Sequence, residues 1–119
     1  MNEMAMMCKK LEINIWNAIK ASSTKPFGFM SFYPGPGTGG HCIPLDPNYL
    51  SWKARSKNFF SRYIDLSNKL NQEMPEYVIK RAGNLLRKKN KVFSKSRILV
   101  IGLSYKKNVP DYHEYPSLK

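Results

Sequence analysis

The feature that most limits the fold of this chain is a run of backbone-breaking residues between positions 23 and 46. Four prolines and five glycines fall within it. Proline removes a backbone donor and glycine raises the entropic cost of ordering, so neither a helix nor a central strand can pass through such a stretch. We therefore predict one long loop here, and long ordered loops in compact domains tend to be functional.

Two short helices are predicted before this loop. Met4, Met7, Cys8 and Leu11 recur at intervals of three and four, which indicates one apolar stripe of a helix over residues 2–11. Asn14 is a suitable N-cap for a second helix over residues 15–22. Its predicted buried side carries Ile15, Trp16 and Ile19.

Two further helices are predicted after the loop. Asp46 is a candidate N-cap, with Pro47 at the first helical position, where its missing N–H costs nothing. A longer helical pattern runs over residues 61–89 and is interrupted by Pro75, which predicts a kink or a restart.

The last part of the chain changes character. A polar and charged segment precedes the apolar run Ile98 to Ile101, which Gly102 ends. Such a run is typical of a parallel strand buried on both faces. One strand cannot form a sheet, so we expect it to pair with structure outside these 119 residues.

Composition narrows the class of protein. The net charge of +12 favours an anionic partner, and the basic runs 53–57, 87–91 and 95–97 are interpreted either as solvated helix faces or as a nucleic-acid surface. The aromatic residues near them have core-like spacing, which counts against nucleic acid; they are Trp52, Phe59, Phe60 and Tyr63. Two cysteines make no disulfide framework, and neither a signal peptide nor a membrane-spanning run is present, so a cytoplasmic location is expected.

The chemistry-bearing residues gather at the end of the loop. Its glycines permit positive φ and a close approach of backbone N–H groups to a ligand, although turn formation alone explains them equally well. Cys42 precedes a predicted helix, whose N-terminus favours a thiolate; the alternative is a small buried hydrophobic residue. His41 is a base or ligand candidate, but no second histidine lies within zinc spacing, so no metal site is predicted.

The segment "TKPFGFMSFYPGPGTGGHCIPLDPNYLSWKAR" (24–55) resembles the active-site segment of the UDP-glucose/GDP-mannose dehydrogenase family, and within it the UDP-N-acetylglucosamine 6-dehydrogenases. The flanking sequences "LNQEMPEYV" (70–78) and "ILVIGLSYKKNVPD" (98–111) are similar to the same family. The resemblance implies a mainly α fold. Residues 1–90 would form part of the helical central dimerisation domain, with the active-site loop at 24–46. Residues 91–97 would be a linker, and residues 98–119 the truncated start, with its first strand, of an α/β UDP-binding domain.

The resemblance also implies an activity. Enzymes of this family use NAD to oxidise the C6 hydroxyl of a UDP-sugar to a carboxylate, through a cysteine thiohemiacetal and thioester. It implies a homodimer formed through the central helices. The NAD-binding domain and the catalytic lysine and asparagine of the family have no counterpart in these residues, so the chain is expected to be a fragment that is inactive by itself.

Individual residues follow by matching. Cys42 is the implied nucleophile, with Asp46 as its partner in hydrolysis. The implied substrate-binding residues are Tyr33, Gly35, Gly37, Gly39, Tyr105 and Lys106. Cys42 and His113 are the implied contacts to NAD. The sequence departs from the family at His113, which replaces an arginine, at Tyr115, which replaces a small residue, and at Glu12, which replaces a glycine. Two interpretations from other classes stay open: a non-enzymatic helical dimerisation module and a basic nucleic-acid-binding module.

Overall fold

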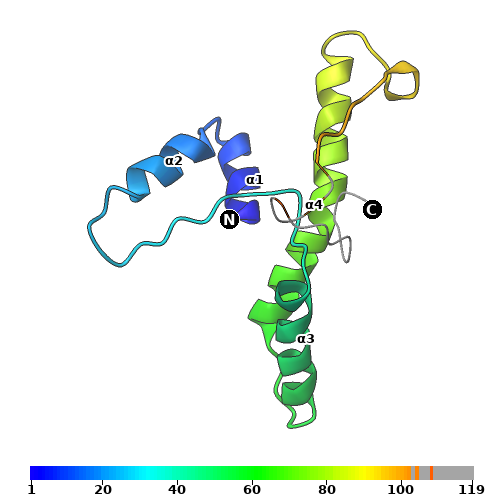
Figure 1. The fold of residues 1–119 in the computed structure, drawn as a ribbon. Coiled ribbons are helices and arrows are strands. Elements are labelled where there is room, and N and C mark those ends of the chain that lie inside the picture. The colour runs from blue at the N-terminus through cyan, green and yellow to red at the C-terminus, as the bar shows by residue number, and fades with distance from the viewer. Residues whose placement is uncertain (103, 105–107, 109–119) are drawn as a thin grey trace. The chain divides into compact units, whose positions relative to one another are not determined.

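The computed structural model describes residues 1–102, 104 and 108 and forms two compact units. The first covers Met1–Gly35 and the second Pro36–Lys119. The described residues contain four α-helices, one short 3-10 helix and no strand, which confirms a mainly α fold (Figure 1).

The first unit is built on a pair of short helices, α1 (Asn2–Lys10) and α2 (Ile15–Ser22). Asn14 caps α2 as predicted: its side-chain oxygen accepts hydrogen bonds from the backbone N–H groups of Trp16 (3.0 Å) and Asn17 (3.4 Å). Glu12, in the connection, has a φ of +58°, a left-handed conformation that glycine adopts more cheaply.

The core of this unit is small. Cys8 on α1 and Ile19 on α2 are buried, as predicted, with 6% and 2% of their surfaces exposed. Trp16, however, was expected on the buried side and is more than half exposed. It lies one residue, or about 100° of helix rotation, from Ile15 and therefore falls outside the stripe that faces α1. The prediction for Trp16 was wrong.

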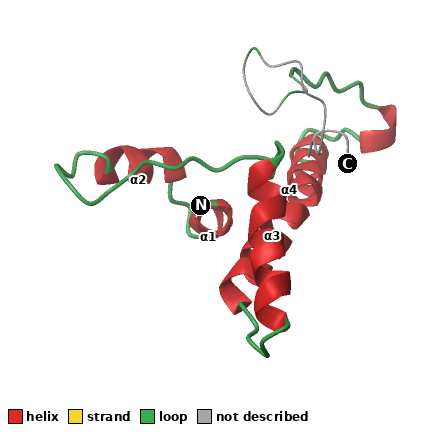
Figure 2. Ribbon diagram, turned by 60° about the horizontal axis from the view of Figure 1, so that its bottom comes forward, coloured by secondary structure: helices red, strands yellow, loops and turns green. Residues whose placement is uncertain are grey.

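The second unit is built on a helical hairpin of α3 (Cys42–Arg55) and α4 (Arg62–Arg87), which lie side by side and antiparallel (Figures 1 and 2). Met74 on α4 is the buried apolar residue of this unit among those described, and Ser51 on α3 is buried and polar. The contact between the two helices therefore combines a little apolar burial with hydrogen bonds.

Two predictions about these helices need correction. Helix α3 begins at Cys42 with His41 at its N-cap, five residues before the predicted start, so Asp46 is not a cap and Pro47 lies inside the helix. Pro44 falls in the first turn, where a backbone N–H has no helical partner and proline is tolerated. Helix α4 runs without a break through Pro75, so the predicted restart is absent.

The aromatic residues near the basic runs do not form a core. Trp52, Phe59, Phe60 and Tyr63 are all between 63% and 81% exposed. A hairpin of two helices buries one side of each helix and leaves the rest of each surface uncovered, so core-like spacing does not guarantee burial here. The prediction that these residues pack in a core was wrong.

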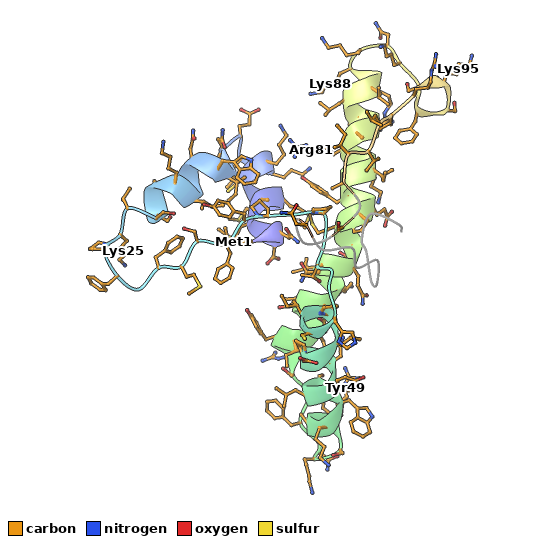
Figure 3. All side chains as sticks on the ribbon, viewed as in Figure 1. Met1, Lys25, Tyr49, Arg81, Lys88 and Lys95 are labelled. Atoms are coloured by element: carbon orange, nitrogen blue, oxygen red, sulfur yellow. The ribbon has the colours of Figure 1, made fainter. Side chains whose placement is uncertain are left out.

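Beyond α4 the chain folds back. The short 3-10 helix η1 spans Phe93–Lys95, and the Phe93 ring lies 3.7 Å from the position that a Cβ on Gly83 would occupy. Figure 3 shows Arg81 on α4, Lys88 at the C-cap that follows α4, and Lys95 on η1. Ile98–Ile101 form no strand and are 51–89% exposed. The predicted strand is thus not formed among the described residues, where it has no partner strand.

No helix in the described part of the chain is both long and apolar enough to cross a membrane.

Candidate functional site

Cys42 occupies the first position of α3, and its side chain is exposed. Exposure excludes the alternative of a small buried hydrophobic residue. The first turn of a helix presents unpaired backbone N–H groups and the positive end of the helix dipole, both of which stabilise negative charge. The thiol is therefore reachable by a ligand and placed where an anion is stabilised.

Asp46 lies four residues after Cys42 in the same helix, and its side chain is also exposed. Residues at this spacing share one helix face, with Cβ atoms roughly 5–6 Å apart. The early start of α3 therefore brings the thiol and the carboxylate onto one face. His41 precedes the helix and makes no side-chain capping hydrogen bond.

Two side-chain hydrogen bonds of Asn48, called the amide relay below, support the first turn of α3. The Asn48 side chain donates to the Pro44 carbonyl at 2.7 Å, and its oxygen accepts from the Asn68 side chain of α4 at 2.5 Å. Pro47 has no N–H to donate to the Ile43 carbonyl, and the Asn48 side chain adds a hydrogen bond to the neighbouring Pro44 carbonyl in the same turn. The relay connects the turn that carries Cys42 to α4.

A second polar contact joins α3 to α4 one turn further on. Ser51 donates to one oxygen of Asp65 at 3.0 Å, and Arg55 donates to the other at 2.7 Å. The Ser51 hydrogen bond, followed by that from Arg55, lowers the pKa of the Asp65 carboxyl below its ordinary value. Ser51 is 3% exposed, whereas the Asp65 and Arg55 side chains remain partly exposed, so the contact joins the two helices at the edge of their packed face.

The glycines just before Cys42 take conformations that other residues avoid. Gly37 has a φ of +135° and Gly40 a φ of +87°, and Gly39 between them is buried. A side chain at either of the two positive-φ positions would strain the backbone. The turn into Cys42 therefore requires glycine, which agrees with the prediction of a specialised loop.

The remaining predicted loop residues belong to the first unit. Tyr33 stacks on Trp16, with ring centroids 5.9 Å apart and planes 22° from parallel, and Gly35 donates its N–H to the Asn2 side-chain oxygen at 2.9 Å. Sequence reasoning missed Asn2 and Trp16. No local pattern pairs residues 17 or 33 positions apart.

Four residues that the sequence singled out lie outside the described part of the chain: Tyr105, Lys106, His113 and Tyr115. The described residues do not fit a dinucleotide. The glycine loop follows no strand, and the helix after it begins with Cys42 rather than with the glycine fingerprint of a nucleotide-binding βαβ unit.

The arrangement of helices is shared with a known class of enzyme. The chain is similar to a solved UDP-D-ManNAc dehydrogenase from Pyrococcus horikoshii, with a TM-score of 0.86 and 31% identity, over 98% of this chain and 27% of that one. The likeness places these helices within a nucleotide-sugar dehydrogenase fold.

Sequence comparison defines the family. Residues 1–73 match the central domain of the UDP-glucose/GDP-mannose dehydrogenase family, and the chain belongs to this family. Among its relatives are the UDP-N-acetyl-D-mannosamine dehydrogenase of Methanococcus maripaludis (38% identical over 98% of this chain) and the UDP-N-acetyl-D-glucosamine 6-dehydrogenase of Pseudomonas aeruginosa (36% over 92%). The chain spans about a quarter of the length of these relatives, 26% in both cases.

Proposed function

We propose that these residues supply the nucleophilic half of an NAD-dependent UDP-sugar 6-dehydrogenase, acting on a UDP-N-acetylhexosamine such as UDP-N-acetylglucosamine. The observation that carries the proposal is the exposed Cys42 at the start of α3 with Asp46 one turn further along the same helix. Two free cysteines agree with a reducing, cytoplasmic compartment.

The chemistry assigned to this chain is covalent capture. When bound by the whole enzyme, NAD would supply the hydride acceptor for the two oxidations. The Cys42 thiolate adds to the C6 aldehyde and forms a thiohemiacetal, whose oxidation leaves a thioester on the sulfur. Water then displaces the thiolate, and Asp46, on the same helix face, orients that water and accepts its proton. The products are the C6 carboxylate and free Cys42.

Substrate contacts are assigned to the loop and to the later segment. The loop contacts the nucleotide sugar through Tyr33 and through three glycines, Gly35, Gly37 and Gly39. The glycines let backbone N–H groups approach the substrate closely. Tyr105 and Lys106 contact the same substrate, and the lysine balances pyrophosphate charge.

Pairing of two copies through the central helices is part of the proposal. Large apolar residues of α4 are uncovered in the single chain, with Leu66, Val78, Ile79 and Leu85 between 43% and 57% exposed. Val78 and Leu85, seven residues apart, share one face of α4, and an exposed apolar face of this kind is suited to a partner helix. The alternative of a non-enzymatic dimerisation module shares this surface but assigns no role to Cys42.

The test is a full-length chimera in which residues 1–119 replace the matching segment of the Methanococcus maripaludis relative. We expect uronate formation with a UDP-N-acetylhexosamine and NAD, and its loss in Cys42→Ala. Cys8→Ala is the matched control, because that thiol is buried in the first unit and should keep the chemistry. In Asp46→Asn we expect a sugar adduct on Cys42 to accumulate, measured by intact-mass spectrometry.

Two results would overturn the proposal. One is uronate formation by Cys42→Ala at the rate of the unsubstituted chimera. The other is an adduct on Cys8 rather than on Cys42. The 119-residue chain by itself is expected to reduce no NAD, since it contains no dinucleotide-binding unit among its described residues.

A further inference from the structure

The return segment 31–35 of the first unit is held by every second residue. Ser31 shares a hydrogen bond of 2.6 Å with Ser23 at the end of α2. Tyr33 stacks on Trp16 near the start of α2, and Gly35 bonds to Asn2 at the start of α1. After the turn at Gly28, which has a φ of +73°, the segment therefore runs back along α2 to α1, as Figure 1 shows.

The spacing of these contacts, at every second residue, leaves one side of the segment uncovered. In an extended segment successive side chains point to opposite sides, so the Ser31 and Tyr33 side chains share one side, while Gly35 is held through its backbone N–H. That side is occupied by contacts to the helices. Phe32, on the other side, is 60% exposed, and Tyr33 keeps 64% of its surface exposed despite the stack. The segment is fixed on one side and available to a ligand on the other.

From these contacts we infer that Asn2 and Trp16 are positioning residues for the substrate loop. They hold the Tyr33 ring and the Gly35 backbone in the conformation that receives the nucleotide sugar. This inference rests on the proposed function, which places Tyr33 and Gly35 at the substrate. A segment fixed before binding loses less conformational entropy when the ligand arrives, so its contribution is to affinity.

Two substitutions of similar size distinguish the hydrogen bond made by Asn2 from the volume of its side chain. In Asn2→Asp a carboxylate oxygen still accepts from the Gly35 N–H, whereas Asn2→Leu removes the acceptor and leaves that N–H without its partner. One hydrogen bond is worth about 1 kcal/mol, which corresponds to about a five-fold change in an equilibrium constant. For Trp16, Phe keeps an aromatic face for Tyr33 and Leu does not.

Kinetics of the chimera distinguish positioning from simple stability. Asn2 and Trp16 touch the loop and not the reacting carbon, so their loss weakens ground state and transition state alike. We expect KM for the UDP-sugar to rise about five-fold in Asn2→Leu and Trp16→Leu, with kcat unchanged. Asn2→Asp and Trp16→Phe should restore KM to within about two-fold of the parent value. A residue that only stabilised the fold would lower the active fraction and leave KM unchanged.

Amide hydrogen exchange of the 119-residue chain gives a second measurement that needs no enzyme activity. The Gly35 N–H should be protected in the parent and in Asn2→Asp, and should exchange faster in Asn2→Leu. An active chimera whose KM is unchanged by both leucine substitutions overturns the positioning role alone. A chimera that forms no uronate overturns the proposed function instead, and an unprotected Gly35 amide in the parent overturns the contact itself.

Discussion

Substitution of Ile19 by alanine is predicted to unfold the first unit. Ile19 is 2% exposed and forms the apolar contact between α1 and α2 together with Cys8. Truncation of a buried isoleucine to alanine costs about 2–5 kcal/mol. Ile19→Val removes one methylene and should cost about 0.5–1.5 kcal/mol.

The first unit is so small that the free-energy cost of Ile19→Ala is comparable to its whole stability. Met1–Gly35 contains 35 residues, and folded proteins have about 0.05–0.15 kcal/mol of stability per residue. The whole unit should therefore be stable by roughly 2–5 kcal/mol, a range that the cost of Ile19→Ala matches. The ratio of folded to unfolded unit should fall by a factor of about 30 for each 2 kcal/mol lost.

Tryptophan emission provides the assay. The chain has two tryptophans, Trp16 in the first unit and Trp52 in the second, so a Trp52→Phe background leaves Trp16 to report on the first unit. In a urea titration, Ile19→Ala should show the unfolded emission without denaturant, and Ile19→Val should shift the midpoint modestly. Ile13→Ala is the control, because that side chain is 50% exposed and its loss should change little. An Ile19→Ala midpoint equal to that of the parent would refute the assigned core.

Three further outcomes are expected. The pKa of Asp65 is lowered in the folded chain, so the contribution of its carboxylate to stability is present above the ordinary pKa of 3.8 and is lost as pH falls through the folded pKa. The difference in urea midpoint between the parent and Asp65→Asn should therefore vanish in acid. A difference that persists at low pH would contradict this. Glu12→Gly should raise the stability of the first unit by about 1 kcal/mol because φ is +58° there, measured by the same Trp16 titration, and a lowered midpoint would contradict the strain. If α4 pairs two copies, Ile79→Glu should shift sedimentation of the chimera from dimer to monomer, and an unchanged dimer would exclude this part of α4 from the interface.

The elements that the sequence predicted well are those set by local rules. The capping of α2 by Asn14 depends on a side chain and two N–H groups within three residues, and the structure shows both hydrogen bonds. Helix α4 follows a long 3.6-residue period, whose ends were predicted within two residues. The predicted restart at Pro75 was wrong: α4 continues through this proline, which removes one backbone hydrogen bond and leaves the rest of the helix in place.

The parts that the sequence could not supply depend on distant partners. The start of α3 was placed at Asp46 because Asp followed by Pro is a strong local start signal. In the structure the first turn is reinforced by Asn48, itself held by Asn68 twenty residues away, and this allows the helix to begin at Cys42. The Trp16–Tyr33 stack likewise joins residues that no periodicity connects.

The corrected start of α3 changes what Asp46 can do. As a cap, its carboxylate would be occupied by backbone N–H groups, and its role in hydrolysis would compete with its role in the helix. At the fifth position of α3 it forms no hydrogen bond or ion pair with any other described residue, and its side chain is exposed. The carboxylate is therefore available to a water molecule, on the same helix face as the thiol that would carry the thioester. Replacement of Asp46 should accordingly leave the folding of α3 almost unchanged while slowing thioester hydrolysis, a separation that the predicted cap would not have allowed.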